Sequence, residues 1–276
     1  MTFLRKLGYN SNKVRTTDFI LMGGIIMDFR KVYDSIPEEF DKWRPRYSDE
    51  LFADVIEYAK LDSGKTALEI GPGTGQATEP ILKTSCSYLA IELGENLAEY
   101  TKDKFSSYDN FQIINADFET YDFGQHQFDL VYSAATIQWI PEKIAFPKVY
   151  KILKSGGSLA MMMIRTDFKS SNEALFTKIQ EVYDKYFHPE IEYTCKLAYN
   201  NVVNYGFVDF ECRNYHKKRE FNADEFVSYI GTHCDHITLQ EPYKSKFYGG
   251  IRDVILSFGN KITLCDTIVL YLARKP

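Results

Sequence analysis

The sequence has few cysteines and no long apolar run, and each shortage excludes a class of protein. Its five cysteines are odd in number and widely spaced, without a CxxC pair, which excludes a disulfide framework and a zinc ribbon. No stretch of about 18 apolar residues occurs, so the sequence predicts no membrane-spanning helix. It also contains no internal repeat and no Gly/Ser linker. We therefore expect a protein of the reducing cytoplasm, without a metal site.

Basic residues are not in excess either. Lys and Arg number 33 against 38 Asp and Glu, which gives a net charge of −5. A mildly acidic chain has no general attraction to nucleic acid or to an anionic membrane, so we expect neither as a partner. Aromatic residues, at 15%, are plentiful and indicate a folded chain with a substantial core. The composition leaves the oligomeric state open.

The first 26 residues do not resemble a secretion signal. The apolar stretch near Phe19 is interrupted by Gly23 and Gly24, and a small-residue cleavage site is missing. A more coherent pattern starts at Met27, so residues 1–26 are interpreted as an extension before the natural start. A loosely docked N-terminal arm is the alternative.

Short apolar runs alternate with helical patterns from Thr66 to Ile164. This alternation indicates βαβ units, and right-handed crossovers between them give a doubly wound parallel sheet. The helices are expected at Asp49–Tyr58, Gln76–Lys83, Glu95–Phe105 and Glu142–Lys154. The strands are expected at Thr66–Ile70, Tyr88–Leu93, Phe111–Asn115, Phe128–Ser133 and Ser158–Ile164.

The pattern changes after Ile164. A helix is expected at Asn172–Phe187 and further strands at Val208–Asn214 and Thr263–Arg274, and Asn222 starts a capping box with Glu225. The sequence thus predicts seven strands in one α/β domain. Its parts are the extension or arm (1–26) and the domain (27–276), the latter divided into a core (60–164), a lid insertion (165–202) and C-terminal strands and helices (203–276).

The loop after the first predicted strand is rich in glycine. Glycine at Gly71, Gly73 and Gly75 lets the backbone approach a ligand closely. A dinucleotide fingerprint GxGxxG needs glycine at position 76, where Gln76 stands, and the phosphate-binding P-loop fails at the same place. A nicotinamide-dependent dehydrogenase is therefore disfavoured.

Acidic residues follow the next two strands. Glu92 ends the second strand, 21 residues beyond Gly71, where a carboxylate can accept both hydroxyl groups of a ribose. Asp117 follows the third strand, where a carboxylate can accept the amino group of an adenine. Ligands of such sheets bind at the carboxyl ends of the strands, so these acids and the glycine loop are expected to meet.

These motifs together resemble the class I S-adenosylmethionine-dependent methyltransferases. ALEIGPGTGQAT is similar to their first motif, AIEL to the second, NADFE to the third, FDLVYSAATIQWIP to the fourth and KILKSGGSLAM to the segment before the fifth strand. FDKWRPRYSDELF is similar to the N-terminal segment of small-molecule methyltransferases of the trans-aconitate methyltransferase-like group. Ser48, Cys234 and Gln240 depart from the residues usual in that group.

The resemblance implies a Rossmann-like sheet with an antiparallel last strand and an N-terminal helical segment. It implies S-adenosylmethionine as the cofactor, S-adenosylhomocysteine as its product, and no metal. Glu69 and the glycine loop would surround the methionine part, Glu92 the ribose, and Asp117 with Phe118 the adenine. The implied cofactor-binding residues are Arg44, Glu69, Gly71, Pro72, Gly73, Thr74, Gly75, Glu92, Leu93, Asp117, Phe118 and Ser133.

Substrate contacts are expected at Trp139, Arg165 and His236, each with an alternative. Trp139 also suits core packing, and Arg165 leaves the fifth strand where it could bind a carboxylate. His236 is the candidate general base, or else a histidine bonded at a helix end. Arg44 could meet the methionine carboxylate or form a surface ion pair. His233, Cys234 and His236 offer too few ligands for zinc.

The predicted function is methyl transfer to a small molecule by in-line displacement. A nucleic-acid amine methyltransferase usually carries [DNS]PP[YF] after the fourth strand, where this chain has Ser133-Ala134-Ala135-Thr136. A protein methyltransferase is a further alternative. A non-catalytic, cofactor-binding relative stays open too, since these enzymes share no invariant catalytic side chain.

Overall fold

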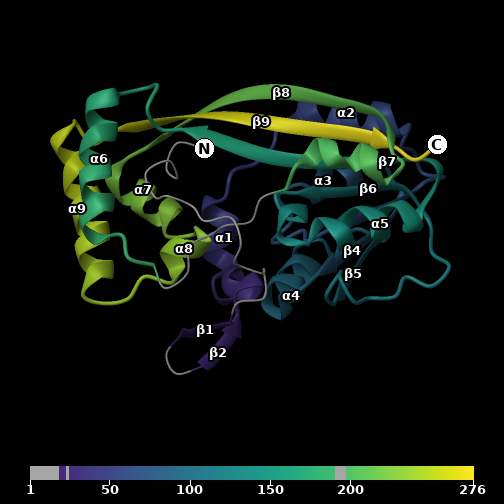
Figure 1. The fold of residues 1–276 in the computed structure, drawn as a ribbon, viewed down its shortest axis with the longest axis horizontal. Coiled ribbons are helices and arrows are strands. Elements are labelled where there is room, and N and C mark those ends of the chain that lie inside the picture. Colours follow the sequence, from purple (N-terminus) through teal and green to yellow (C-terminus); the bar gives the residue numbers. More distant parts are fainter. Residues whose placement is uncertain (1–18, 23–24, 190–196) are drawn as a thin grey trace.

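The computed structural model describes residues 19–22, 25–189 and 197–276 of the chain. Its main sheet has seven strands in the order β5-β4-β3-β6-β7-β9-β8 (Figure 1). Strands β3 to β7 pair in parallel, whereas β9 runs antiparallel to β7 and β8. The predicted seven-stranded, doubly wound sheet with an antiparallel last strand is confirmed. The strands are β3 (Thr66–Ile70), β4 (Ser87–Glu92), β5 (Phe111–Asn115), β6 (Phe128–Ala134), β7 (Leu153–Asp167), β8 (Val208–Phe221) and β9 (Ile262–Arg274).

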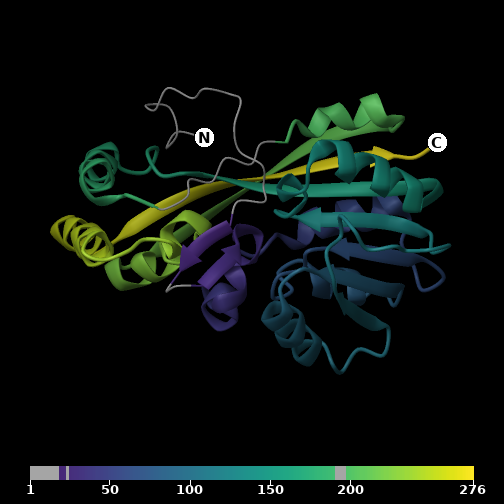
Figure 2. The ribbon, with the colours of Figure 1, turned by 60° about the horizontal axis from the view of Figure 1, so that its bottom comes forward.

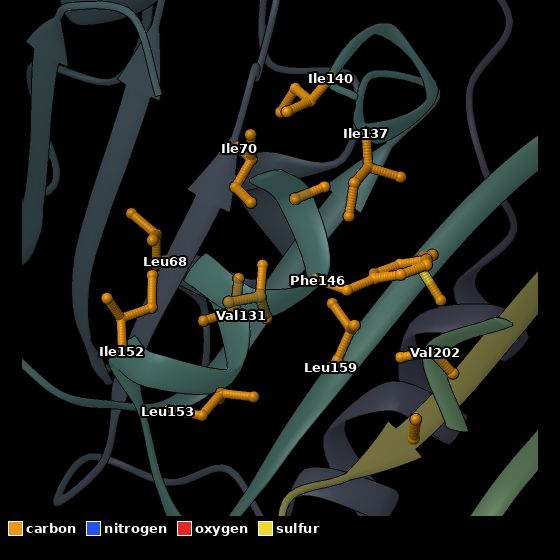
Figure 3. Close-up of a cluster of buried hydrophobic side chains, with 14 of the residues drawn as sticks. Leu68, Ile70, Val131, Ile137, Ile140, Phe146, Ile152, Leu153, Leu159 and Val202 are labelled. Carbon is orange, nitrogen blue, oxygen red and sulfur yellow. The ribbon is translucent and has the colours of Figure 1, made fainter. Parts of the chain in front are cut away.

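Both faces of the central strands are buried, which explains their nearly continuous apolar sequences. Leu68 and Ile70 of β3 pack on the face covered by helix α5, which contributes Phe146 (Figure 3). Ala67 belongs to the other face, where helix α3 contributes Ile81. The helices around the core are α2 (Asp49–Ala59), α3 (Thr78–Leu82), α4 (Glu95–Lys104) and α5 (Glu142–Ile152).

The last three strands are much longer than the core needs. Strand β7 was expected at Ser158–Ile164, but it begins at Leu153 and continues to Asp167, while β8 and β9 run beside it. Beyond the core these strands carry a second hydrophobic cluster around Leu175, Phe226 and Phe247. We call α6, α7 and α9 the helical lobe; it lies at the far end of the long strands (Figure 1). The helices are α6 (Glu173–Tyr186), α7 (Ala223–Ile230), α8 (Cys234–Ile237) and α9 (Tyr243–Ser257).

The predicted lid insertion, 165–202, contributes to three parts of the fold. Its start belongs to β7, helix α6 packs in the lobe, and the 3-10 helix η3 (Tyr199–Tyr205) packs on the core through Val202. Residues 190–196, with Cys195, lie outside the described residues. Closure of this insertion over a ligand stays a prediction.

The N-terminal segment contains the expected helical turns and a hairpin that the sequence pattern did not predict. A two-stranded antiparallel sheet precedes 3-10 helix η1 and helix α1 (Figure 2). Of the proposed extension, residues 1–18, 23 and 24 lie outside the described residues. None of the helices described is long and apolar enough to cross a bilayer. The elements are β1 (Phe19–Met22), β2 (Ile25–Asp28), η1 (Phe29–Ser35) and α1 (Pro37–Trp43).

Candidate functional site

The glycine loop follows β3 and is packed against the end of β6. Gly71 has φ +64°, and a Cβ added there would lie 2.3 Å from Cγ2 of Thr136. The Thr136 hydroxyl donates a hydrogen bond to the Gly71 carbonyl at 2.9 Å. Gly75 has φ +82°, and a Cβ added there would lie equally close to the Phe105 ring. These contacts leave no room for side chains, so the exposed part of the loop presents its backbone.

The other loop residues are held by neighbouring elements. The Pro72 carbonyl accepts from the backbone N–H of Gly75 at 2.9 Å. Thr74 is buried, and its carbonyl accepts from Nζ of Lys104 at 2.9 Å. The loop is therefore fixed before any ligand binds.

Glu92 lies at the end of β4, directly beside this loop. Its side chain is buried, and its two oxygens accept from the backbone N–H groups of Gly73 at 3.0 Å and Gly94 at 2.9 Å. Burial raises the pKa of Glu92 to about 7, although both backbone bonds oppose the shift. Leu93 follows, with its carbonyl accepting from the Asn115 side-chain amide. A carboxylate held in this way can accept two hydroxyl donors when it is ionised.

Asp117 follows β5 and carries an ion pair that the sequence analysis did not anticipate. Its Oδ1 accepts from the backbone N–H of Glu119 at 2.8 Å, and its Oδ2 accepts from Nη1 of Arg30 at 2.9 Å. Phe118 is buried in the core against Phe123, with ring centroids 5.8 Å apart. Asp117 thus follows the end of β5 and Phe118 packs in the core; contact of either residue with an adenine stays a prediction.

Asp34 joins the N-terminal segment to helix α4. Helix α4 begins after Gly94, which has no side chain for capping, and Asp34 accepts from the Leu97 backbone N–H at 2.9 Å instead. A Cβ at Gly94 would lie 2.4 Å from the Asp34 carboxylate. Asp34 and Arg30 thus bind the segment Asp28–Ser35, which we call the strap, to the ends of β4 and β5. The sequence offered one signal, the helix-capping Asp28 before η1.

Glu69 is completely buried within β3. Its Oε2 accepts from Thr78 at 2.6 Å and from the Tyr88 hydroxyl, which itself lies 2.5 Å from that of Tyr132. Oε1 has no hydrogen-bond partner among the described residues. Burial raises the pKa of Glu69 despite these donors. Contact of Glu69 with the methionine part stays a prediction, and the unpaired oxygen is compatible with it.

Residues at the end of β6 and after it pack beside the glycine loop. The Ser133 hydroxyl donates to the Ile70 carbonyl at 3.1 Å and accepts from the Ile137 N–H at 3.0 Å. Trp139 packs against Phe29 and Tyr33 of the strap, with ring centroids 5.7 and 6.1 Å apart. Trp139 therefore contributes to packing at this edge, and its contact with a substrate stays a prediction.

Arg44 follows α1 and is stacked between aromatic rings. Its guanidinium lies 5.3 Å from the centroid of Phe40 and 5.9 Å from that of Tyr33. Phe40 in turn approaches the glycine loop, because a Cβ on Gly73 would lie 3.0 Å from its ring. No carboxylate pairs with Arg44 among the residues that the structure describes. Contact of Arg44 with the methionine carboxylate stays a prediction.

His236 lies in α8 with both ring nitrogens engaged. Nδ1 is 2.7 Å from Oδ1 of Asp235, and Nε2 is 2.8 Å from the Tyr183 hydroxyl of α6. The neighbouring His233 is half-buried, and its desolvation together with the nearby positive groups holds its pKa well below the usual range. The pair of bonds favours a positioning role for His236, while its role as a base stays a prediction.

Two arginines lie on opposite faces of the long strands. Arg165 is exposed and donates to the Tyr271 hydroxyl at 2.8 Å; its substrate contact stays a prediction. Arg219 is largely buried and forms a bidentate pair with the buried Asp266, which also accepts from Thr166 at 2.7 Å. No group of acids, histidines or cysteines in the described part of the chain is arranged to hold a metal ion.

Comparisons with known proteins agree with this geometry. A family model described as a methyltransferase domain matches residues 68–161, from β3 into β7. The ribosomal RNA small subunit methyltransferase A of Clostridium acetobutylicum is 30% identical over 115 residues, 40% of each chain. The malonyl-[acyl-carrier protein] O-methyltransferase of a Marinomonas species is 26% identical over 131 residues, 46% of this chain and 48% of that protein. The chain matches less than half the length of these relatives.

A solved structure shares the fold. Phosphoethanolamine N-methyltransferase 2 of Haemonchus contortus, in complex with phosphomonomethylethanolamine and S-adenosylhomocysteine, aligns with a TM-score of 0.54 at 16% identity. The alignment covers 90% of this chain and 59% of that protein. The segment from β3 into β7 therefore matches a methyltransferase domain, and the chain as a whole shares the fold of a solved methyltransferase.

Proposed function

We propose that the protein transfers the methyl group of S-adenosylmethionine to a small-molecule acceptor. The observation that carries the proposal is the buried Glu92 carboxylate, bonded to the Gly73 N–H at 3.0 Å. Glu92 lies beside β3. On one side of β3 the sheet continues with β4 and β5, and on the other side with β6 and β7, so the strand order reverses there. Open α/β sheets bind nucleotide-like ligands at such a switch point.

The residues of the site suit the three parts of the cofactor. Glu92 would accept the ribose hydroxyls, Asp117 the adenine amino group, and Arg44 would bind the methionine carboxylate. Because Gly71 carries no side chain, its backbone would approach the ligand closely. The orphaned Oε1 of Glu69 could accept from the ammonium group through a local rearrangement. When bound, the cofactor would supply an electrophilic methyl group on a sulfonium, with S-adenosylhomocysteine as the leaving group.

The chain's own contribution is binding, orientation and exclusion of water. Phe29 and Val32 of the strap are buried with Cys234 of α8, and Trp139 packs against this cluster. We propose that the strap and α8, packed together in this way, cover the cofactor site, which would suit a small acceptor better than a base within folded RNA. Positioning of the two reactants can contribute about 7–11 kcal/mol to such a reaction. We further propose a cytoplasmic location, based on the cysteine content.

The test is to incubate the protein with methyl-labelled S-adenosylmethionine and, separately, small metabolites, total RNA and protein extract. Label in the metabolite fraction supports the proposal, with the Glu92→Ala variant as the negative control. Label in RNA would overturn the small-molecule acceptor and place this chain with its ribosomal RNA methyltransferase relatives. Label in protein would identify a protein methyltransferase. Binding of the cofactor without label transfer to any fraction would favour the non-catalytic alternative.

A further inference from the structure

Arg30 of the strap is surrounded by three carboxylates. Its guanidinium lies 2.7 Å from Asp28, 2.9 Å from Asp117 and 2.9 Å from Glu119. The Arg30 side chain is only 14% exposed. One positive charge therefore faces three acidic groups in a partly buried place. Two of these acids come from the loop after β5, 87 and 89 residues further along the chain.

Arg30 fixes the orientation of Asp117 but leaves part of its carboxylate free. A carboxylate has about four acceptor positions. The Glu119 N–H uses one on Oδ1 and Arg30 uses one on Oδ2. The Asp117 side chain remains 24% exposed, so a ligand can reach it. The remaining positions suit N–H donors.

The excess of acidic groups around Arg30 determines whether a ligand that donates hydrogen bonds or one that accepts them is favoured. Burial raises the pKa of Glu119, and the nearby Asp117 adds to the shift while Arg30 opposes it. Lys148 also faces Asp117 and Glu119, but its amino group donates to the carbonyls of Glu119 and Tyr121. A ligand that presents an amino group is thus favoured. A ligand that presents a carbonyl oxygen would place an acceptor against Asp117 and be repelled.

We propose that Arg30 is a positioning residue that holds Asp117 for the 6-amino group of the cofactor's adenine, so that the strap takes part in base recognition. The proposal rests on the proposed function and adds a residue outside the nucleotide-binding motifs. The contact between Arg30 and Asp117 also couples recognition of the base to the docking of the strap. The strap is anchored at Asp117, at α4 through Asp34 and at Trp139 through Phe29, so the base that Asp117 reads lies next to the strap's own anchor.

The experiment compares S-adenosylhomocysteine with S-inosylhomocysteine, in which a 6-oxo group replaces the amino group. Calorimetric titration measures both ligands against the full-length protein and its variants. The variants are Arg30→Gln, Arg30→Lys, Asp117→Asn and Lys31→Gln. Lys31 is the matched control, since it follows Arg30 in η1 and has no ion pair with a described residue.

We expect wild type and Lys31→Gln to prefer the adenosyl ligand at least tenfold. Asp117→Asn should lose the preference, because an amide can also donate to a 6-oxo group. Arg30→Gln should reduce the preference to less than threefold, and Arg30→Lys should keep part of it. Circular dichroism and thermal unfolding confirm that each variant is folded.

Two results would overturn the inference. In the first, Arg30→Gln keeps the wild-type preference, either with both affinities unchanged or with both weakened equally, as a merely structural strap would. In the second, Asp117→Asn keeps the preference, so that Asp117 does not face the 6-position. Failure of the wild type to bind either ligand would instead overturn the proposed function, on which this inference depends.

Discussion

The carboxylate of Glu92 accepts a hydrogen bond from the backbone N–H of Gly73 at 3.0 Å, and this bond joins β4 to the glycine loop. The two residues are 19 positions apart in sequence; Glu92 ends β4, and Gly73 lies in the loop that follows the neighbouring parallel strand β3. A buried acid and the glycine loop therefore meet at one edge of the sheet. This relationship makes the site sensitive to pH.

Cofactor affinity should rise with pH because Glu92 must be ionised to accept two ribose hydroxyls. Burial raises the pKa of Glu92 to about 7 in the free protein. Binding then releases a proton below pH 7, and the affinity should increase about tenfold from pH 6 to pH 8. Calorimetry in buffers of different ionisation enthalpy measures both quantities. Glu92→Gln should bind weakly and show neither change; a flat wild-type profile would contradict the prediction.

The same group affects the stability of the free protein in the opposite direction. The pKa of Glu92 in the folded protein lies above the usual carboxyl value, so ionisation of this group disfavours the folded state. The contribution of the protonated Glu92 to the free energy of unfolding is therefore fully present below about pH 4.5. Roughly 3 kcal/mol of it is lost as the pH rises through about 7. Urea unfolding between pH 5 and 8 should therefore show a steeper decline for wild type than for Glu92→Gln. Parallel declines would count against a buried, protonated Glu92.

Substitution of Gly71 should cost more than its backbone conformation alone explains. Gly71 and Gly124 have similar φ values of +64° and +58°, but a Cβ would clash with Thr136 only at Gly71 and would meet open space at Gly124. Gly124→Ala should lower the free energy of unfolding by about 1–2 kcal/mol, the cost of the left-handed conformation. Gly71→Ala should lower it by a further ~1–3 kcal/mol. Chemical denaturation measures both, and equal losses would show that the packing against Thr136 is unimportant.

The buried pair of Arg219 and Asp266 should be important for stability only when one partner is removed. The side chains are 11% and 2% exposed. Asp266→Asn leaves a buried guanidinium uncompensated and should cost about 3–5 kcal/mol, whereas the double variant Arg219→Met/Asp266→Leu should be near wild type. Arg213 lies on the same strand as Arg219 and pairs with Asp54, but these two side chains are 36% and 28% exposed. Arg213→Gln should therefore lower the free energy of unfolding by less than about 1 kcal/mol. Equal costs for Asp266→Asn and Arg213→Gln in urea unfolding would refute this difference.

His236 can be tested once the labelling experiment has identified an acceptor. Its ring bonds to Asp235 and Tyr183 predict a positioning role, so His236→Gln should lower kcat less than about tenfold and keep the acidic limb of the pH profile. Removal of a general base would lower kcat about 10²–10⁴-fold and would abolish the acidic limb of the pH profile. Tyr183→Phe keeps the ring and removes only the hydroxyl bond. A hundredfold loss of kcat in His236→Gln would establish it as the base.

The βαβ half of the fold could be predicted closely from the sequence. Strands β3 and β5 have the expected bounds. The apolar run of β3 is buried on both faces, whereas β5 is a partly exposed edge strand whose short apolar run still ends before turn residues. The extension of β7 to Asp167 was missed because Arg165 and Asp167 are exposed and interrupt the apolar run. Helix α9 was missed too, since Gly249 and Gly250 lie inside it.

The parts of the site contributed by distant segments could not be predicted. Glu92 and Asp117 were found because strand ends carry their own local pattern. Arg30 and Asp34 act on residues 87 and 63 positions away, and no local spacing announces such contacts. Only the packing of the strap against β4 and β5 brings them to the site.

The most direct test of the central claim is calorimetric titration of S-adenosylhomocysteine into wild type, Glu92→Ala and Glu99→Ala. Glu99 is the control, because it is an exposed acid on α4. The account predicts micromolar binding by wild type and Glu99→Ala, and at least tenfold weaker binding by Glu92→Ala, about 1.4 kcal/mol or more. Absence of binding by well-folded wild type, or equal affinity in Glu92→Ala, would contradict a cofactor site built around Glu92.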